Sequence, residues 1–205
     1  MKNIRRETQI WLQIISFVVI WAVVLYLTDT GFSINVEALK KLPEVVTLYT
    51  LLYLGFAKWG WRWRVFQGWL VPFPDLEGTW EGTVQTTWQD ASGSMMPATT
   101  VFLVIKQSYS SVSCVMHSKE SISHSNAAMI SEDENSGLKK LSYNYTNTPR
   151  VMVRDRSVVH DGAAILRIIN DGARALEGEY WTNRKSTGEI NVRFKTRSLM
   201  QAFPD

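Results

Sequence analysis

The chain has 205 residues, of which 45% are hydrophobic, 20% are charged and 12% are aromatic, and its formal net charge is +3. This apolar fraction excludes wholesale disorder, which requires low hydrophobicity and a high net charge. A single cysteine, Cys114, excludes a disulfide framework, and three histidines leave few ligands for a zinc centre. We therefore expect a folded protein without a metal site.

The basic excess lies in the first part of the chain. Residues 1–75 contain eight Lys or Arg and five Asp or Glu, whereas residues 76–205 contain fourteen of each. Six of the nine tryptophans also precede residue 76. Because binding to DNA or RNA requires a basic surface, a second part without net charge argues against a nucleic-acid polymer as partner.

Residues 10–27 form an uncharged, mainly apolar run. Crossing the hydrocarbon of a bilayer takes about 20 such residues. Lys2, Arg5 and Arg6 precede the run, as in a signal peptide. However, the run exceeds the roughly 7–15 apolar residues of signal peptides, and no small-residue cleavage site follows it. We expect a first transmembrane helix here.

A second candidate span covers about residues 45–63. It is uncharged up to Ala57, and after Lys58 tryptophans and arginines alternate through residue 64. Tryptophan favours the headgroup region, and basic side chains near a helix end extend to it. The segment therefore indicates a span whose last turns lie in the interface, or alternatively a buried or interfacial amphipathic helix.

The distribution of basic residues sets the expected orientation. They precede the first span and end the second, whereas the link at residues 28–44 carries two lysines and three acidic residues. The positive-inside rule then places both the N-terminus and the remainder of the chain in the cytoplasm. Residues 1–75 are thus predicted to form a multi-pass membrane hairpin with an aromatic-basic linker.

Residues 76–205 have the pattern of an all-β domain. Period-2 alternation with one apolar face recurs in short runs. The expected strands are residues 79–89, 99–107, 112–118, 125–131, 139–146, 163–169, 176–183 and 189–196. Turn signals separate them, including Asp161-Gly162, Asp171-Gly172 and Thr187-Gly188. Eight short strands with short turns predict a compact eight-stranded up-and-down antiparallel β-barrel, with an open two-sheet sandwich as the alternative.

The second part carries no recognisable catalytic motif. It contains no glycine-rich phosphate loop, no Gly-x-Ser-x-Gly elbow and no His-Glu-x-x-His. Cys114 and His117 point to opposite faces of a strand, and Cys114 shares its face with Val112 and Met116. We expect Cys114 to pack in the core and the protein not to be an enzyme.

The run at residues 176–184 contains the candidate binding residues. Strand parity places Tyr180, Thr182 and Arg184 on the interior face, with Thr182 and Arg184 at the barrel mouth or inside it. An arginine there could bind a phosphate through its planar set of donors. Alternatively, Arg184 caps the barrel end through Glu81 or Glu179.

Three further aromatic residues fall on apolar strand faces: Trp80, Tyr143 and Tyr145. Such rings either stack on the bases of a ligand or pack in the core. The sequence pattern leaves both roles open.

Three short motifs carry a family resemblance. They are residues 76–82 (Leu-Glu-Gly-Thr-Trp-Glu-Gly), Tyr143-Asn-Tyr145 with Pro149, and residues 178–184 (Gly-Glu-Tyr-Trp-Thr-Asn-Arg) with Gly188. With two spans before a compact barrel, the chain resembles bacterial membrane receptors that act as effectors in cyclic-oligonucleotide-based antiphage signalling (CBASS). In that family the barrel takes the place of the ligand-binding domain of STING-like receptors.

The resemblance implies a function without catalysis. A partner nucleotidyltransferase makes a cyclic dinucleotide, the barrel binds it, the receptor self-associates, and the spans disrupt the inner membrane, which leads to cell death or growth arrest. The expected ligand-binding residues are Trp80, Tyr143, Tyr145, Tyr180, Thr182 and Arg184. The alternative is a membrane-tethered, lipocalin-like carrier or sensor of an apolar ligand, since an eight-stranded barrel can hold one small ligand.

Overall fold

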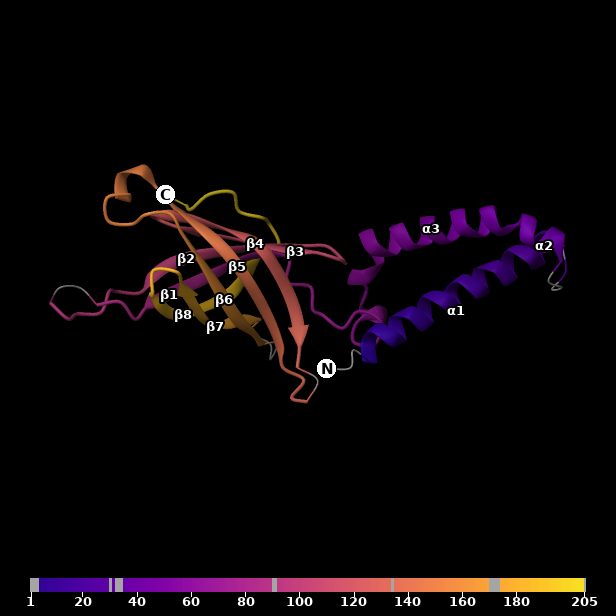
Figure 1. Cartoon of the computed structure of the whole chain (residues 1–205), viewed down its shortest axis with the longest axis horizontal. Helices are drawn as coiled ribbons and strands as arrows, with labels where there is room; N and C mark the ends of the chain where they lie inside the picture. The colour runs from indigo at the N-terminus through magenta and orange to yellow at the C-terminus, as the bar shows by residue number, and fades with distance from the viewer. Residues whose placement is uncertain are drawn as a thin grey trace. The chain divides into compact units, whose positions relative to one another are not determined.

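The computed structural model describes residues 4–29, 31, 35–89, 92–133, 135–169 and 174–204, with side chains from Ile10 onward (Figure 1). It divides into two compact units, Met1–Pro72 and Phe73–Asp205. The second unit starts before Leu76, because Pro74 and Asp75 accept hydrogen bonds from side chains of the barrel.

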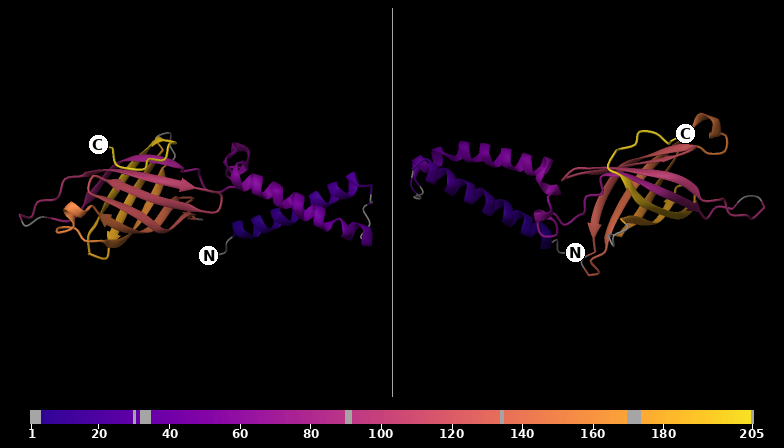
Figure 2. Two further views of the ribbon diagram at one scale, coloured as in Figure 1. Left: turned by 90° about the horizontal axis from the view of Figure 1, so that it is seen from above. Right: turned by 180° about the vertical axis from the view of Figure 1, so that it is seen from behind.

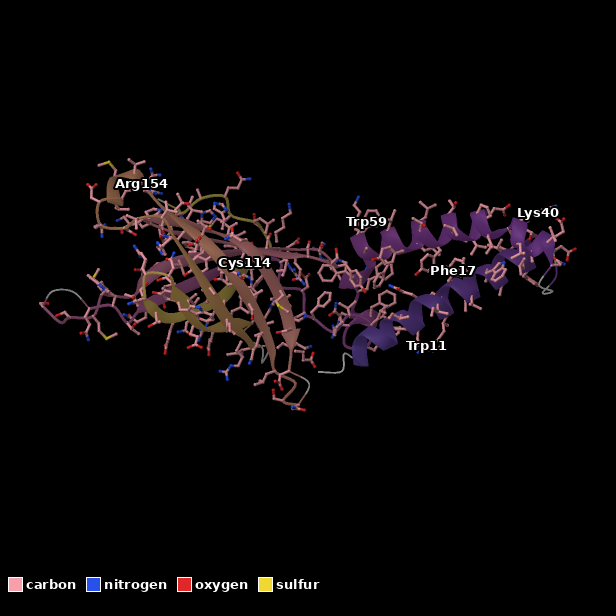
Figure 3. The ribbon with its side chains drawn as sticks, in the orientation of Figure 1. Trp11, Phe17, Lys40, Trp59, Cys114 and Arg154 are labelled. Carbon is pink, nitrogen blue, oxygen red and sulfur yellow. The ribbon has the colours of Figure 1, made fainter. Side chains whose placement is uncertain are left out.

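The first unit is a helical hairpin of α1 (Ile4–Leu27), the short α2 (Val36–Lys40) and α3 (Leu42–Lys58). Phe17 of α1 faces α3, where its ring packs edge-on against Tyr49 with the centroids 5.7 Å apart (Figure 3). Asn35 begins α2 by accepting a hydrogen bond from the backbone N–H of Ala38 at 2.8 Å. The two long helices therefore pack as an antiparallel pair.

Among the described residues, α1 is the one helix long and apolar enough to cross a membrane, over Ile10–Leu27. The second predicted span is not confirmed, because α3 has seventeen residues and ends at Lys58 instead of continuing to Trp63. Trp59 leaves helical geometry (φ −128°, ψ −45°), and Gly60, a weak helix former, opens the 3₁₀ turn Gly60–Arg62. A second 3₁₀ turn covers Arg64–Phe66.

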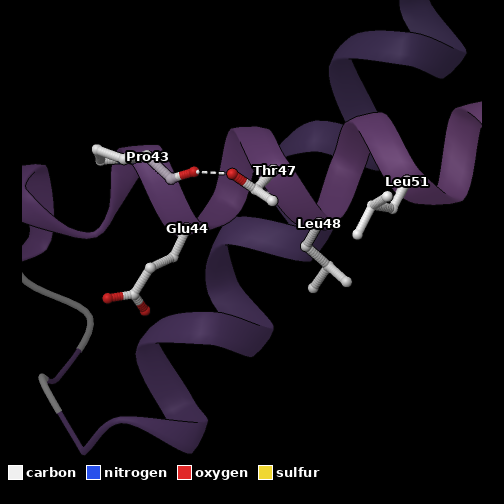
Figure 4. Close-up of a pocket in the computed structure, with 5 residues that line it drawn as sticks. All are labelled: Pro43, Glu44, Thr47, Leu48 and Leu51. Atoms are coloured by element: carbon white, nitrogen blue, oxygen red, sulfur yellow. Dashed lines mark hydrogen bonds between the residues drawn. The ribbon is translucent and has the colours of Figure 1, made fainter.

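One face of α3 is hollowed (Figure 4). The hollow is lined by Pro43, Glu44, Thr47, Leu48 and Leu51. The Thr47 hydroxyl donates to the carbonyl oxygen of Pro43 at 2.8 Å, so the helix backbone satisfies this polar group. The face is therefore largely apolar, with one carboxylate at its N-terminal end.

The second unit is a closed barrel of eight antiparallel strands in sequential order, in which β1 also pairs with β8 (Figures 1 and 2). The strands are β1 (Gly78–Thr86), β2 (Thr99–Gln107), β3 (Val112–Ser118), β4 (Ser121–Glu132), β5 (Lys139–Pro149), β6 (His160–Ile169), β7 (Ala175–Thr182) and β8 (Thr187–Thr196). The prediction of an eight-stranded up-and-down barrel is confirmed, and the β3–β4 pairing is the shortest of its contacts, over Val115–His117 and Ile122–His124.

Two of the predicted turns are wrong. Asp161-Gly162 lies within β6 and Thr187-Gly188 within β8. Gly162 is needed for a different reason, since a Cβ there would lie 2.6 Å from the hydroxyl oxygen of Tyr145. The third turn signal, Asp171-Gly172, lies outside the described residues.

The barrel interior is filled by apolar side chains from all eight strands, among them Leu103, Leu141, Leu166 and Leu176. Cys114 packs among them as expected, and burial raises the pKa of its thiol to about 12. Its thiolate is therefore scarce at neutral pH, which argues against a nucleophilic role.

One end of the barrel is closed by the chain that leads into β1. Leu76 is buried, and its backbone N–H donates to Oε1 of Gln107 at 2.7 Å. The amide of Gln107 donates to the carbonyl oxygen of Pro74 at 3.1 Å, and Nε1 of Trp80 donates to the carbonyl oxygen of Leu76 at 2.9 Å. Leu76, Trp80 and Gln107 thus form the floor of the barrel, and the Arg174 guanidinium lies 5.6 Å from the Trp80 ring centroid.

Candidate functional site

The end of the barrel opposite the floor carries polar side chains on its inner face. There β5 and β7 end and β6 and β8 begin. Residues paired across neighbouring strands share a face. Leu103 is buried and faces inward, and successive pairing from it leads to Met116, Ser123, Asn147 and His160, which therefore also face inward. We call this region, with Ser123, Asn147, His160 and Thr182 as its inward-facing residues, the polar end.

A layer of tyrosine rings separates the apolar core from the polar end. Tyr143 and Tyr145 have centroids 5.9 Å apart at an interplanar angle of 47°. Burial raises the pKa of both phenols, and the nearby Tyr180 raises that of Tyr145 further. The buried hydroxyl of Tyr143 has no hydrogen-bond partner within the part of the chain that the structure describes. It can therefore serve a polar group that enters the barrel.

Asn147 and His160 are buried partners on adjacent strands. Ser123 donates to Oδ1 of Asn147 at 2.8 Å, which fixes the orientation of the amide. Nδ1 of His160 donates to the carbonyl oxygen of Val158 at 2.9 Å. Burial lowers the pKa of His160, and the charge of Arg184 lowers it further. At neutral pH the imidazole is thus uncharged, and its other nitrogen is an acceptor.

Thr182 ends β7 on the inner face, and Arg184 follows in the turn to β8. Arg184 is exposed and donates to Oγ of Ser157 at 3.4 Å. The expected continuation of the strand face to Arg184 is wrong, because β7 ends at Thr182 and Lys185 adopts a positive φ of 62°. Arg184 nevertheless lies two residues beyond Thr182 and contacts Ser157, which precedes β6, so its guanidinium lies at the rim of the polar end.

The alternative partner Glu81 is engaged elsewhere, since its carboxylate binds Nζ of Lys195 at 3.0 Å. The guanidinium of Arg184 instead has a hydroxyl within reach, which is a weak partner for a full charge.

The structure brings together five of the six predicted residues and separates one. Tyr145, Tyr180, Thr182 and Arg184 gather at the polar end, with Tyr143 beneath them. Trp80 lies in the floor, with 1% of its surface exposed. It shares the inward face with the others but not their level along the barrel.

Ser123, Asn147 and His160 were not predicted from the sequence. Asn147 has the same parity as Tyr143 and Tyr145, so extending the fifth predicted strand by one residue would have found it. His160 was obscured by the expected turn at Asp161-Gly162. Among the residues that the structure describes, no group of three His, Cys, Asp or Glu side chains could hold a metal ion.

Comparison with known proteins identifies the family. Residues 71–194, more than half of the chain, match the family described as Cap15, cyclic dinucleotide receptor domain. The chain belongs to this family. It is 26% identical over 148 residues to CD-NTase-associated protein 15 of Staphylococcus schleiferi, covering 72% of this chain and 75% of the relative. A protein of the same name from Escherichia albertii is 26% identical over 149 residues, covering 71% and 73%. The resemblance seen in the sequence motifs is thereby confirmed.

Proposed function

We propose that the barrel binds a cyclic dinucleotide at the polar end and acts as a CBASS effector. The observation that carries this proposal is the grouping of adjacent tyrosine rings, a fixed amide and a rim arginine at the end opposite the floor. Membership of a cyclic dinucleotide receptor family supports the same ligand class.

Each part of such a ligand has a chemical counterpart at the polar end. The guanidinium of Arg184 suits a phosphate, because charge-assisted hydrogen bonds to phosphate are strong and directional. The rings of Tyr145 and Tyr180 suit stacking on flat bases. The amide of Asn147, with a donor and an acceptor, suits a base edge. Largely apolar sites with a few placed polar groups are typical of small-ligand binding.

We further propose that α1 and α3 hold the protein in the bacterial inner membrane, with the N-terminus and the barrel in the cytoplasm. The seventeen residues of α3 span about 25 Å at 1.5 Å per residue. Its outer surface carries exposed Val46, Leu51, Leu52 and Leu54. These apolar side chains suit lipid, and the basic residues at and beyond the C-terminal end of α3 match those at the start of the chain.

In this proposal a partner nucleotidyltransferase supplies the ligand, and ligand binding drives self-association of the receptor. The assembled spans then disrupt the inner membrane, which kills or arrests the cell. The full chain in liposomes should release a trapped dye only when the cyclic dinucleotide is added, and mass photometry in detergent should show larger species under the same conditions. Release without ligand would contradict the coupling.

Calorimetry of the full chain in mild detergent against a panel of cyclic dinucleotides tests the binding site. Arg184→Ala should weaken binding by roughly 10–100-fold, because a hydrogen bond to a charged group contributes about 1.5–3 kcal/mol. The control Arg167→Ala removes an exposed arginine that pairs with Glu177 on the outer face, and it should leave affinity unchanged.

Absence of heat for every cyclic dinucleotide would contradict the proposed ligand class. Equal affinities of the wild type and Arg184→Ala would remove only the arginine from the site. A lipid that co-purifies inside the barrel and is detected by native mass spectrometry would instead favour the lipocalin-like carrier.

A further inference from the structure

The segment at the C-terminal end of α3 and just beyond it concentrates positive charge and exposed aromatic surface. We call residues 58–69 the aromatic-basic segment. It contains Lys58, Arg62 and Arg64, and no acidic residue lies between Glu44 and Asp75. The family match starts at residue 71 and therefore does not include this segment.

Three tryptophans of the segment are largely exposed although the indole ring is strongly apolar. Trp59 and Trp63 are each 60% exposed, and Trp69 is 58% exposed. A cluster of large apolar side chains on the surface marks an interaction site with a partner or a membrane. Tryptophan in particular favours the boundary between hydrocarbon and headgroups.

The aromatic-basic segment is folded and not a loose linker. Phe66 lies at its centre: the Trp63 ring is stacked on it at a centroid distance of 6.1 Å, and the Trp69 ring is tilted by 47° against it at 6.2 Å. Nε1 of Trp69 donates to the carbonyl oxygen of Val65 at 2.5 Å. The amide of Gln67 donates to the carbonyl oxygen of Trp61 at 2.8 Å, which ties the two 3₁₀ turns together. The tryptophans are therefore held in place before any partner binds.

Cationic side chains lie directly beside indole rings of this segment. Nζ of Lys58 is 4.6 Å from the Trp59 ring centroid, and the guanidinium carbon of Arg62 is 4.9 Å from that of Trp61. An anionic lipid presents the complementary pair, a phosphate beside an apolar boundary. Basic residues at the cytoplasmic surface contribute attraction to anionic lipids that zwitterionic lipids do not provide.

We propose that the aromatic-basic segment binds anionic lipid headgroups, with its exposed tryptophans at the membrane boundary and its basic side chains on the lipid phosphates. This inference rests on the proposed attachment of the chain to a membrane. The proposal gives the segment a lipid preference, so the bilayer around residues 58–69 should be enriched in anionic lipid.

Electron spin resonance of spin-labelled lipids in bilayers that contain the full chain measures this preference. The readout is the association constant of phosphatidylglycerol relative to phosphatidylcholine. The wild type should favour phosphatidylglycerol, by up to about fivefold for each basic residue at low salt. The variant Arg62→Gln/Arg64→Gln should lose most of the preference, and salt should weaken it in the wild type.

The matched control is Arg154→Gln/Arg156→Gln, which removes the same charge from the segment between β5 and β6, where Arg154 is labelled in Figure 3. Both arginines are exposed, and the control should keep the wild-type preference. A wild type without preference, or equal loss in the control, would overturn the proposal. So would an unchanged preference in Arg62→Gln/Arg64→Gln.

Flotation of the same bilayers separates two kinds of failure. A chain that does not float with lipid overturns both the membrane attachment and this inference, whereas a floating chain without lipid preference overturns the inference alone.

Binding of labelled single-stranded RNA tests a nucleic-acid partner for the same segment. If the wild type binds the RNA and Arg62→Gln/Arg64→Gln does not, while lipid preference is equal in both, the segment belongs to a nucleic-acid partner and the proposal fails.

Discussion

Replacing Trp80 with phenylalanine separates a role in the floor from a role in ligand binding. Nε1 of Trp80 donates to the carbonyl oxygen of Leu76, and removing a buried hydrogen bond costs about 1 kcal/mol. The smaller ring also loses buried apolar surface and leaves a void, which adds about 1–2 kcal/mol. Trp80→Phe should therefore lower the free energy of unfolding by about 2–3 kcal/mol and leave the affinity for the cyclic dinucleotide unchanged, because the floor lies opposite the polar end.

Urea unfolding of the full chain in mild detergent, followed by far-ultraviolet circular dichroism, measures the stability change, and calorimetry measures affinity. The control Trp181→Phe alters a half-exposed ring on the outer face of β7 and should change stability by less than about 0.5 kcal/mol. If Trp80→Phe weakens ligand binding tenfold or more at unchanged stability, Trp80 contacts the ligand and the placement of the site at the polar end is wrong.

Three further predictions concern the barrel. Gly178→Ala would press its Cβ against the carbonyl oxygen of Ile165 and should lower the free energy of unfolding by about 3 kcal/mol, measured by thermal unfolding. The control Gly137→Ala lies in an open turn at φ +67° and should lower it by only about 1 kcal/mol. Cys114, with an ordinary pKa of 9.0 and a folded value of about 12, favours the folded state below pH 9 and loses that contribution as the pH rises. Between pH 8 and 10 the wild type should therefore lose about 1.4 kcal/mol more stability than Cys114→Ala in urea titrations, and equal losses would refute the burial of the thiol. Because burial lowers the pKa of His160 below 6.5, the unfolded chain takes up a proton first as the pH falls. His160→Gln should thus be less sensitive than the wild type to acid between pH 6.5 and 5 when midpoints of urea unfolding are compared.

The barrel was predictable because several strands alternate between apolar and polar residues, and turn residues separate the apolar runs. The bounds expected for β2 and β3 agree with the structure, since apolar residues face inward along most of their length. β4 begins at Ser121, four residues before its expected start at Ser125. Its first inward positions include Ser123, and a polar residue facing a polar end gives no apolar period.

For the candidate site, the sequence predicted which residues face the barrel interior but not how high each one lies along the barrel axis. Parity places Trp80 and Tyr145 on the inner surface, which the structure confirms. Their separation along the barrel depends on how strands far apart in sequence are registered, and local alternation contains no information on register between strands. For the same reason the pairing of Asn147 with His160 could not be read from the sequence.

In the helical hairpin, composition predicts the apolar run but not the residue at which the helix ends. Composition correctly marks an apolar run up to Ala57, but the end of α3 depends on the backbone at Trp59 and Gly60. The alternation of tryptophan and arginine after Lys58 suggested a continuing helix, whereas those residues form 3₁₀ turns around Phe66. Aromatic clustering between neighbouring turns is a tertiary effect that hydropathy does not report.

The floor has a practical consequence for dissecting this receptor. Pro74 and Asp75 precede the first strand, yet their oxygens bind Gln107 and Arg197 of the barrel. A soluble fragment that starts at Leu76 would keep every strand and still lose both of these attachments. A fragment that starts at Phe73 retains both hydrogen bonds. The N-terminal limit of the barrel domain is therefore set by Pro74 and Asp75, which anchor the first strand, and not by the first residue of that strand.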